Sequence, residues 1–184
     1  GPFTEATNLD FAPLTDLLTK LLRQKPDVLI LMGPFVDGTQ ECMASGDMEL
    51  PEEDESGNIT GKHAASYDMV FIEKVIRDGV NSIYEAMENE GEELPTHIVM
   101  VPSLLDAHHE CVYPQPPFGA REEEFQIKTP YFKEKIGDLK VKNGDNSNPA
   151  KPKRVHLMSN PCMFRVNEVL FGVTTNDILF NLTQ

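Results

Sequence analysis

The pattern of apolar positions along the chain predicts helices and strands in alternation. Leucines at spacings of three and four form one apolar stripe between Pro13 and Gln24, which predicts an amphipathic helix that Pro26 closes. A continuous apolar run from Val28 to Met32 follows and ends at Gly33-Pro34. A run of this length and composition is typical of a strand that flanking helices bury on both faces.

The same two elements are predicted again further along the chain. Apolar residues recur with helical spacing from Ile72 to Met87, stopping near Gly91 and Pro95, and Ile98 to Val101 has the composition of a second buried strand. The order helix, strand, helix, strand favours a parallel sheet with helices packed on its face. We therefore expect an α/β fold.

The last third of the chain consists of shorter apolar runs. Three short strands are predicted, at Val155–Met158, Cys162–Val166 and Val169–Val173, with Asn167-Glu168 as a two-residue turn between the last two. A short helix is predicted from Asp177 to Leu182. Because the chain opens without a strand and finishes inside a helix, we expect an incomplete piece of a domain.

Aromatic and sulfur side chains in these strands allow two interpretations. Met163, Phe164 and Phe171 have the residue types of a base-stacking platform for nucleic acid. Their alternation within short strands favours ordinary core packing.

Two polar stretches interrupt the predicted elements, and we interpret both as insertions. The first, residues 41–61, is acidic, and the second, residues 119–153, is mostly charged. The interval from Arg121 to Arg154 holds nine of the sixteen lysines and arginines against six acidic residues. A solvated loop is the simpler interpretation of that interval, and a weakly basic patch is the alternative.

The overall charge and the cysteines limit the classes of partner. The 184-residue chain carries a formal net charge of −14, which opposes contact with phosphate backbones, so DNA is expected to be at most an indirect partner. Its three cysteines lie far apart without a Cys-x-x-Cys pair, which argues against a disulfide framework or a cysteine zinc site and fits a reducing compartment. No apolar run approaches the roughly 20 residues that span a bilayer, so no membrane partner is expected.

The segment from Asp106 to Phe118, which reads DAHHECVYPQPPF, is the most unusual part of the sequence. Its prolines fix backbone torsions and remove amide donors, which predicts a stiff, extended surface loop. His108, His109 and Glu110 suggest a metal or acid–base site, whereas a solvated polar loop is the simpler interpretation.

Ligands of α/β folds bind in the loops that follow the carboxyl ends of parallel strands. In this chain those loops are residues 1–4, 33–37, 102–110 and 172–177. A two-metal phosphoesterase needs carboxylates, an asparagine and several histidines there, in Gly-Asp-x-x-Asp, Gly-Asn-His and Gly-His-x-His loops. Pro34 stands in place of the bridging aspartate, the second loop lacks the Asn-His pair, and the last one reads Gly-Val-Thr-Thr through Thr175.

These substitutions predict a vestigial metal site with no catalytic activity and no cofactor. Its positions are Pro34, Asp37, Asp106, His108, His109 and Thr175. The remaining carboxylates and a histidine pair on a surface loop do not make a dinuclear cage. Two alternatives stay open: an active metal-dependent phosphoesterase that uses Asp37, Asp106, His108 and His109 as an altered ligand set, and a free-standing acidic binding domain.

Several motifs, in order across nearly the whole chain, carry a resemblance to a known family. They read GPFT, PLTDLL, KPDVLILMGPFVD, VPSLLDAHHECVYPQPPF, SNPC and NEVLFGVTTNDILF. This set resembles the B subunits of eukaryotic DNA polymerase alpha, and VYPQPPF is its most specific element. The chain departs from the family pattern at Cys111, where we expect proline, and at Leu105, where we expect arginine.

The resemblance implies a calcineurin-like metallophosphoesterase fold, with β-sheets flanked by helices and a decayed active site. Residues 1–184 would be part of that inactive domain, and the two insertions look longer than usual for the family. The implied function is a non-catalytic scaffold and regulatory subunit of the DNA polymerase alpha–primase complex, which initiates DNA replication in the nucleus. The implied partners are the C-terminal domain of the polymerase catalytic subunit and the primase subunits.

Overall fold

A three-stranded parallel sheet lies at the centre of the fold. The computed structural model describes residues 1–5, 8–53, 59–92, 94–119 and 154–183. Strands β1 (Val28–Met32), β4 (His97–Val101) and β5 (Val155–Leu157) lie in the order β1-β4-β5, and both neighbouring pairs are parallel. The predicted parallel sheet and the positions of its strands are thereby confirmed.

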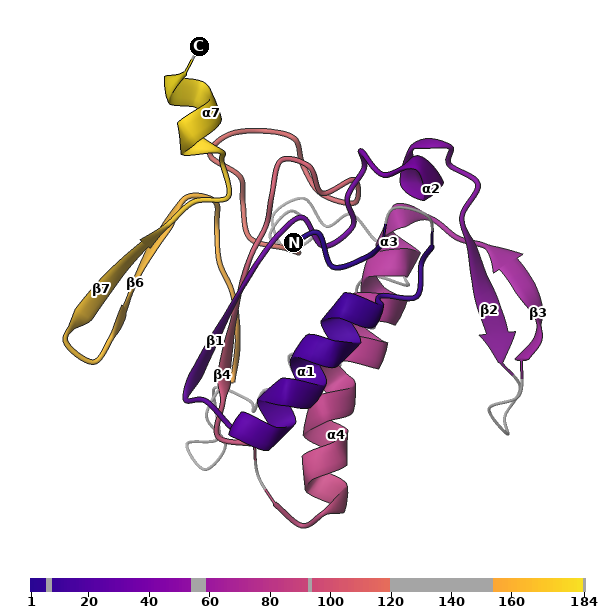
Figure 1. Cartoon of the computed structure of the whole chain (residues 1–184), viewed down its shortest axis with the longest axis horizontal. Helices are drawn as coiled ribbons and strands as arrows, with labels where there is room; N and C mark the ends of the chain where they lie inside the picture. The colour runs from indigo at the N-terminus through magenta and orange to yellow at the C-terminus, as the bar shows by residue number, and fades with distance from the viewer. Residues whose placement is uncertain (6–7, 54–58, 93, 120–153, 184) are drawn as a thin grey trace.

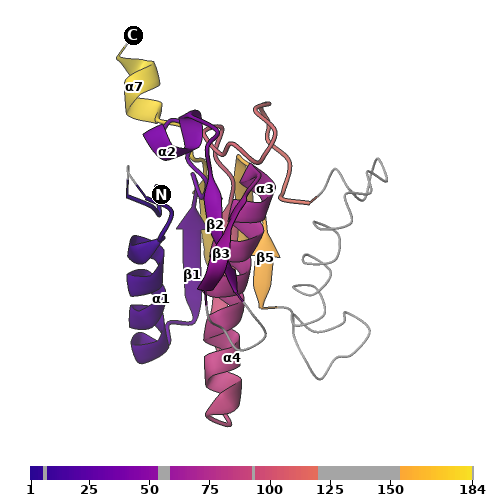
Figure 2. The ribbon, with the colours of Figure 1, turned by 90° about the vertical axis from the view of Figure 1, so that its right-hand side faces the viewer.

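Helices cover one face of this sheet. Helix α1 (Ala12–Gln24) packs beside a long continuous helix built from α3 (Tyr67–Val70), η1 (Phe71–Asn81) and α4 (Ser82–Asn89). The views in Figures 1 and 2 show α1 and α4 together on one side of β1 and β4. Both predicted helices are confirmed, although the π-helical hydrogen bonding of η1 has no signal in the apolar spacing. No helix in the described part of the chain is long and apolar enough to cross a membrane.

The opposite face of the sheet has no helix on it in the described part of the chain. Leu31 is buried in the main core, whereas Val28 and Ile30 pack toward a second, smaller cluster that includes Val99 and Cys162. Within the described residues, the prediction that helices bury β1 on both faces is therefore confirmed for one face only. A continuous apolar run indicates that both faces of a strand are covered, but it does not indicate which element covers each face.

An antiparallel hairpin lies on this helix-free side (Figure 1). It consists of β6 (Cys162–Val166) and β7 (Val169–Val173), followed by α7 (Ile178–Leu182), so the predicted strands and helix are confirmed. The predicted turn is confirmed as well, with Asn167 in the left-handed conformation at φ 50°.

The two faces of this hairpin differ in burial. Phe164 lies opposite Phe171, with ring centroids 5.6 Å apart, and both are half-buried toward the sheet. Met163 is 67% exposed, so the prediction of core packing is wrong for this residue. Successive side chains of a strand point to opposite faces, which places Met163 on the outer face.

The acidic stretch of residues 41–61 contributes to the core, which its composition did not indicate. It contains α2 (Glu41–Ala44), β2 (Glu49–Glu53) and the start of β3 (Ile59–Ala64), and the two strands form an antiparallel hairpin beyond α3 (Figures 1 and 2). Met43 and Leu50 are buried in the main core cluster. Residues 120–153, which hold almost all of the second predicted insertion and of the predicted basic interval, lie outside the described residues.

Candidate functional site

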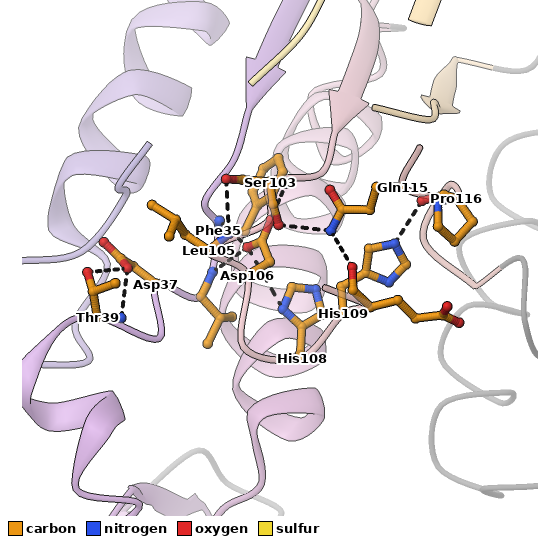
Figure 3. Close-up of polar contacts among 12 residues, drawn as sticks. Phe35, Asp37, Thr39, Ser103, Leu105, Asp106, His108, His109, Gln115 and Pro116 are labelled. Atoms are coloured by element: carbon orange, nitrogen blue, oxygen red, sulfur yellow. Dashed lines mark hydrogen bonds and ion pairs between the residues drawn. The ribbon is translucent and has the colours of Figure 1, made fainter. Parts of the chain in front are cut away.

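The loops that follow β1 and β4 lie side by side at the carboxyl edge of the sheet (Figure 3). Asp37 of the first loop and Asp106 of the second form an isolated antiparallel bridge. The backbone N–H of Gly38 donates to the carbonyl oxygen of Leu105 at 2.9 Å. Two of the four loops that sequence analysis selected are therefore joined directly through their backbones.

The carboxylate of Asp106 holds this junction together. One oxygen, Oδ1, accepts the backbone N–H groups of Phe35 at 2.5 Å and Val36 at 3.0 Å, and Oδ2 accepts that of Ser103 at 2.7 Å. The side chain is fully buried, and this burial raises the pKa of Asp106 to about 6, although the three amide donors act in the opposite direction. The carboxylate thus links both loops from the interior of the protein.

Asp37 uses its carboxylate within its own turn. Its Oδ1 accepts the backbone N–H of Thr39 at 2.9 Å and the Thr39 hydroxyl at 2.7 Å. Figure 3 shows this side chain directed toward Thr39 rather than toward Asp106. The two carboxylates are close in the fold, but their hydrogen bonds go to different partners.

His108 is packed as an aromatic side chain. Its ring packs against those of Phe71 and Phe118, at centroid distances of 4.0 Å and 5.1 Å with interplanar angles of 18° and 21°, and the two phenylalanine rings lie 4.8 Å from each other. Neither ring nitrogen has a hydrogen-bond partner within the described structure. Burial lowers the pKa of His108 well below its ordinary value, so the imidazole is neutral and the 3.9 Å from its Nδ1 to Asp106 Oδ1 is not an ion pair. The interpretation of a solvated polar loop is wrong for this residue.

His109 has a different environment from its neighbour. Its Nε2 lies 2.7 Å from the carbonyl oxygen of Pro116, and its ring contacts that of Phe118. Partial burial lowers the pKa of His109, so this imidazole also favours the neutral form. Among the described residues, no group of three or more His, Cys, Asp or Glu side chains is placed to hold a metal ion.

The proline-rich loop is anchored by a fully buried glutamine. Gln115 Nε2 donates to the carbonyl oxygens of Ser103 and Glu110, both at 2.9 Å, and the backbones of Gln115 and Asn160 exchange two hydrogen bonds. Tyr113 is exposed, so only part of the segment is the surface loop that the prolines predict. Sequence reasoning missed Gln115 as an anchor; its one signal was an amide side chain among prolines that cannot donate a backbone hydrogen bond.

Asn160 connects this loop to the end of β7. Its Oδ1 accepts the Thr174 hydroxyl and the backbone N–H of Thr175, each at 3.1 Å. The Thr175 hydroxyl in turn donates to the carbonyl oxygen of Pro102 at 2.9 Å. Sequence reasoning selected Thr175 as a vestigial position but missed Asn160, which is fully buried.

Pro34 is buried beside the same junction. It follows Gly33, whose backbone N–H donates to the carbonyl oxygen of Val101 at 2.9 Å. The structure therefore gathers all the predicted positions at one edge of the sheet. Hydrogen bonds and ring contacts within the chain engage the carboxylates, the hydroxyl and the imidazoles at these positions.

Comparison with known proteins assigns the chain to a family. The sequence model of the family of DNA polymerase alpha/epsilon B subunits matches residues 1–184. The chain belongs to this family. The resemblance inferred from the sequence motifs is thereby confirmed.

Several relatives in this family are named as B subunits of DNA polymerase alpha. The chain is 33% identical over 182 residues to the protein from Bos taurus and 31% identical over 182 residues to that from Mus musculus, which is 99% of this chain and 22% of each relative. It is 26% identical over 185 residues to the protein from Schizosaccharomyces pombe, covering 100% of this chain and 24% of that relative. The chain therefore spans less than a quarter of the length of these relatives.

Proposed function

We propose that this chain is part of a non-catalytic scaffold and regulatory subunit of the DNA polymerase alpha–primase complex. The observation that carries the proposal is the use of the candidate ligands as structural groups. Asp106 accepts hydrogen bonds from three backbone amides, and His108 is packed against the rings of Phe71 and Phe118. These side chains join loops where a hydrolase would hold its metal ions.

The chemistry of a two-metal centre supports the inactive interpretation. Such a centre needs carboxylate oxygens and imidazole nitrogens that point at the cations. The Pro34 side chain has no atom that can ligate a cation, and the Asp37 carboxylate accepts hydrogen bonds from Thr39 within its own turn. We therefore interpret residues 1–184 as part of an inactive phosphoesterase-like domain of calcineurin-like fold, with insertions at residues 41–61 and 119–153.

The names of the relatives support a role in assembly. Proteins from three species that match almost the whole chain are named as B subunits of DNA polymerase alpha. In the proposed role, the subunit tethers the catalytic subunit through the latter's C-terminal domain and associates with primase in the nucleus. The net charge of −14 disfavours direct contact with DNA and fits a protein partner.

Co-expression of the full-length protein with the C-terminal region of the polymerase alpha catalytic subunit tests the tethering. We expect the two chains to co-purify in a fixed ratio through affinity and size-exclusion chromatography. Elution as separate species at micromolar concentration would refute the scaffold role.

An activity assay tests the inactive site separately. The full-length protein is incubated with manganese and a generic phosphodiester, alongside the Asp37→Ala variant and a matched control, Asp10→Ala, at an exposed position. We expect no turnover by any of the three. Turnover that Asp37→Ala abolishes and Asp10→Ala retains would establish an active phosphoesterase with an altered ligand set.

A further inference from the structure

Three backbone amides converge on one point between the loops that follow β1 and β4. Two of them belong to the consecutive residues Phe35 and Val36, and the third belongs to Ser103, about 70 positions away in the sequence. At this point lies the Asp106 carboxylate, which is fully buried (Figure 3). Successive backbone N–H groups aimed at one point form a concave arrangement that favours anions.

The direction of these donors excludes a cation from the same position. Each N–H presents the positive end of its dipole to the carboxylate, so a metal ion placed there would face three like partial charges. Oxyanions have the opposite preference, because each oxygen offers lone pairs to the amides. The distances of 2.5, 2.7 and 3.0 Å lie in or just below the usual range of amide-to-oxygen hydrogen bonds.

A second observation concerns the polar group beside this position. His108 has a side chain that is 1% exposed, and its Nδ1 lies 3.9 Å from Asp106 Oδ1. Both of its ring nitrogens are buried without a hydrogen-bond partner in the described structure. The wall of the site therefore contains an unpartnered polar side chain that faces the carboxylate, in addition to the three amides.

We propose that the amides of Phe35, Val36 and Ser103 form an oxyanion-binding site for one carboxylate-sized group, which Asp106 fills from within the chain. The site is selective for a small, planar monoanion because the amides reach both oxygens of one carboxylate. When the Asp106 carboxylate is removed, a free anion of the same shape binds in its place and restores the junction between the two loops. This inference does not depend on the proposed function.

Anion rescue of a truncated side chain tests the site. In the full-length protein, Asp106→Ala removes one carboxylate, and formate has the same three heavy atoms. Thermal unfolding is followed in sodium formate and in sodium chloride at equal ionic strength. At formate concentrations roughly ten times the dissociation constant, we expect the melting temperature of Asp106→Ala to rise by about 2–4 °C relative to chloride, with no difference for the wild type.

Two further variants control for general effects of the salt. Asp106→Asn keeps the space filled, and Asp37→Ala removes a carboxylate that accepts hydrogen bonds only within its own turn. The melting temperature of each of these two variants should be the same in formate as in chloride. A response of Asp106→Ala that is equal in the two salts, or equal to that of Asp37→Ala, overturns the proposal. If Asp106→Ala folds only in formate, the proposal is supported, and if it folds in neither salt, the proposal is rejected.

Discussion

The imidazole of His108 lies face to face with the ring of Phe71, with centroids 4.0 Å apart and planes inclined by 18°. Phe118 lies 5.1 Å from the imidazole and 4.8 Å from Phe71, so the three rings form one cluster. Because no partner of the ring nitrogens is present in the described structure, the shape of the ring accounts for this packing more than its polarity does. His108 therefore behaves as a core aromatic residue at the edge of the sheet.

Replacing this ring by another aromatic ring should preserve stability. We expect His108→Phe to lie within about 1.5 kcal/mol of the wild type in free energy of unfolding, since the shape is nearly conserved. His108→Ala should lose about 2–5 kcal/mol because it leaves a cavity beside the rings of Phe71 and Phe118. Urea unfolding of the full-length protein measures both. Equal losses in the two variants would mean that a ring nitrogen makes an essential interaction.

Asp106 and His108 change the stability in opposite directions as the pH varies. Burial raises the pKa of Asp106 from 3.8 to about 6, so the folded protein favours the protonated carboxyl group. The stability that results is present below about pH 4 and is lost as the pH rises through 6. Burial lowers the pKa of His108 well below 6.5, so the stability that the neutral ring contributes is present above pH 6.5 and is lost as the pH falls. The pKa of His109 is shifted in the same direction as that of His108.

The His108→Phe variant separates these contributions. Because phenylalanine does not titrate, the free energy of unfolding of the variant relative to the wild type should increase as the pH falls below 6.5. The limiting slope for one proton is about 1.4 kcal/mol per pH unit. Urea unfolding of both proteins between pH 7 and pH 5 gives the difference. A constant difference across this range would mean that His108 titrates normally in the folded protein.

The sheet and its helices follow from the sequence, because apolar periodicity directly reflects which face of an element is buried. Strands β1 and β4 each coincide with an uninterrupted apolar run. The core role of Leu50 could not be predicted in this way, since its neighbours are acidic residues and proline. Short strands with one buried side chain leave too few apolar positions to form a pattern.

The loops after β1 and β4 were predicted as the site, but not the interactions within it. Two of the three donors to Asp106 are backbone amides of Phe35 and Val36, which lie 71 and 70 positions away. Nearly every residue has a backbone N–H, so the identity of Phe35 does not reveal this role. Distance along the chain also explains why His108 was predicted as a candidate ligand. Its aromatic neighbour Phe71 is far away in the sequence and Phe118 is separated from it by prolines, so the sequence does not reveal the ring packing.

Gln115 and Asn160 should stabilise the proline-rich loop as a coupled pair. Gln115→Ala removes the donor to the carbonyl oxygens of Ser103 and Glu110, and we expect a loss of about 1–3 kcal/mol in the free energy of unfolding. Asn160→Ala removes the acceptor for the Thr175 N–H and should have a loss of similar size.

The double variant distinguishes coupling from two independent effects. Because the Asn160 amide also lies 3.3 Å from Gln115 Oε1, the combined loss should differ from the sum of the single losses by about 0.5–3 kcal/mol. Gln24→Ala, at an exposed position at the end of α1, is the matched control and should stay within about 0.5 kcal/mol of the wild type. Additive losses at Gln115 and Asn160 would contradict the coupling.

Gly33 should be intolerant of a side chain because of the space around it. A Cβ atom at this position would lie 2.6 Å from Asp106 Oδ2 and 2.9 Å from the backbone nitrogen of Ser103. Both atoms belong to the loop after β4, where the Ser103 N–H donates to Asp106 Oδ2, so alanine must displace that bond or push the two loops apart. We expect Gly33→Ala to lower the free energy of unfolding by about 1–3 kcal/mol, as measured by urea unfolding.

Gly61 in β3 provides the matched control for this substitution. A Cβ atom there would have Glu52 Oε2 as its nearest neighbour at 3.5 Å, which is ordinary contact with the end of a flexible side chain. Gly61→Ala should therefore be neutral or stabilising by about 0.4–1 kcal/mol, through the reduced entropy of the unfolded chain. If Gly33→Ala is as stable as Gly61→Ala, the loops after β1 and β4 must be able to separate without cost. The hydrogen bonds of Asp106 would then contribute little to holding them together.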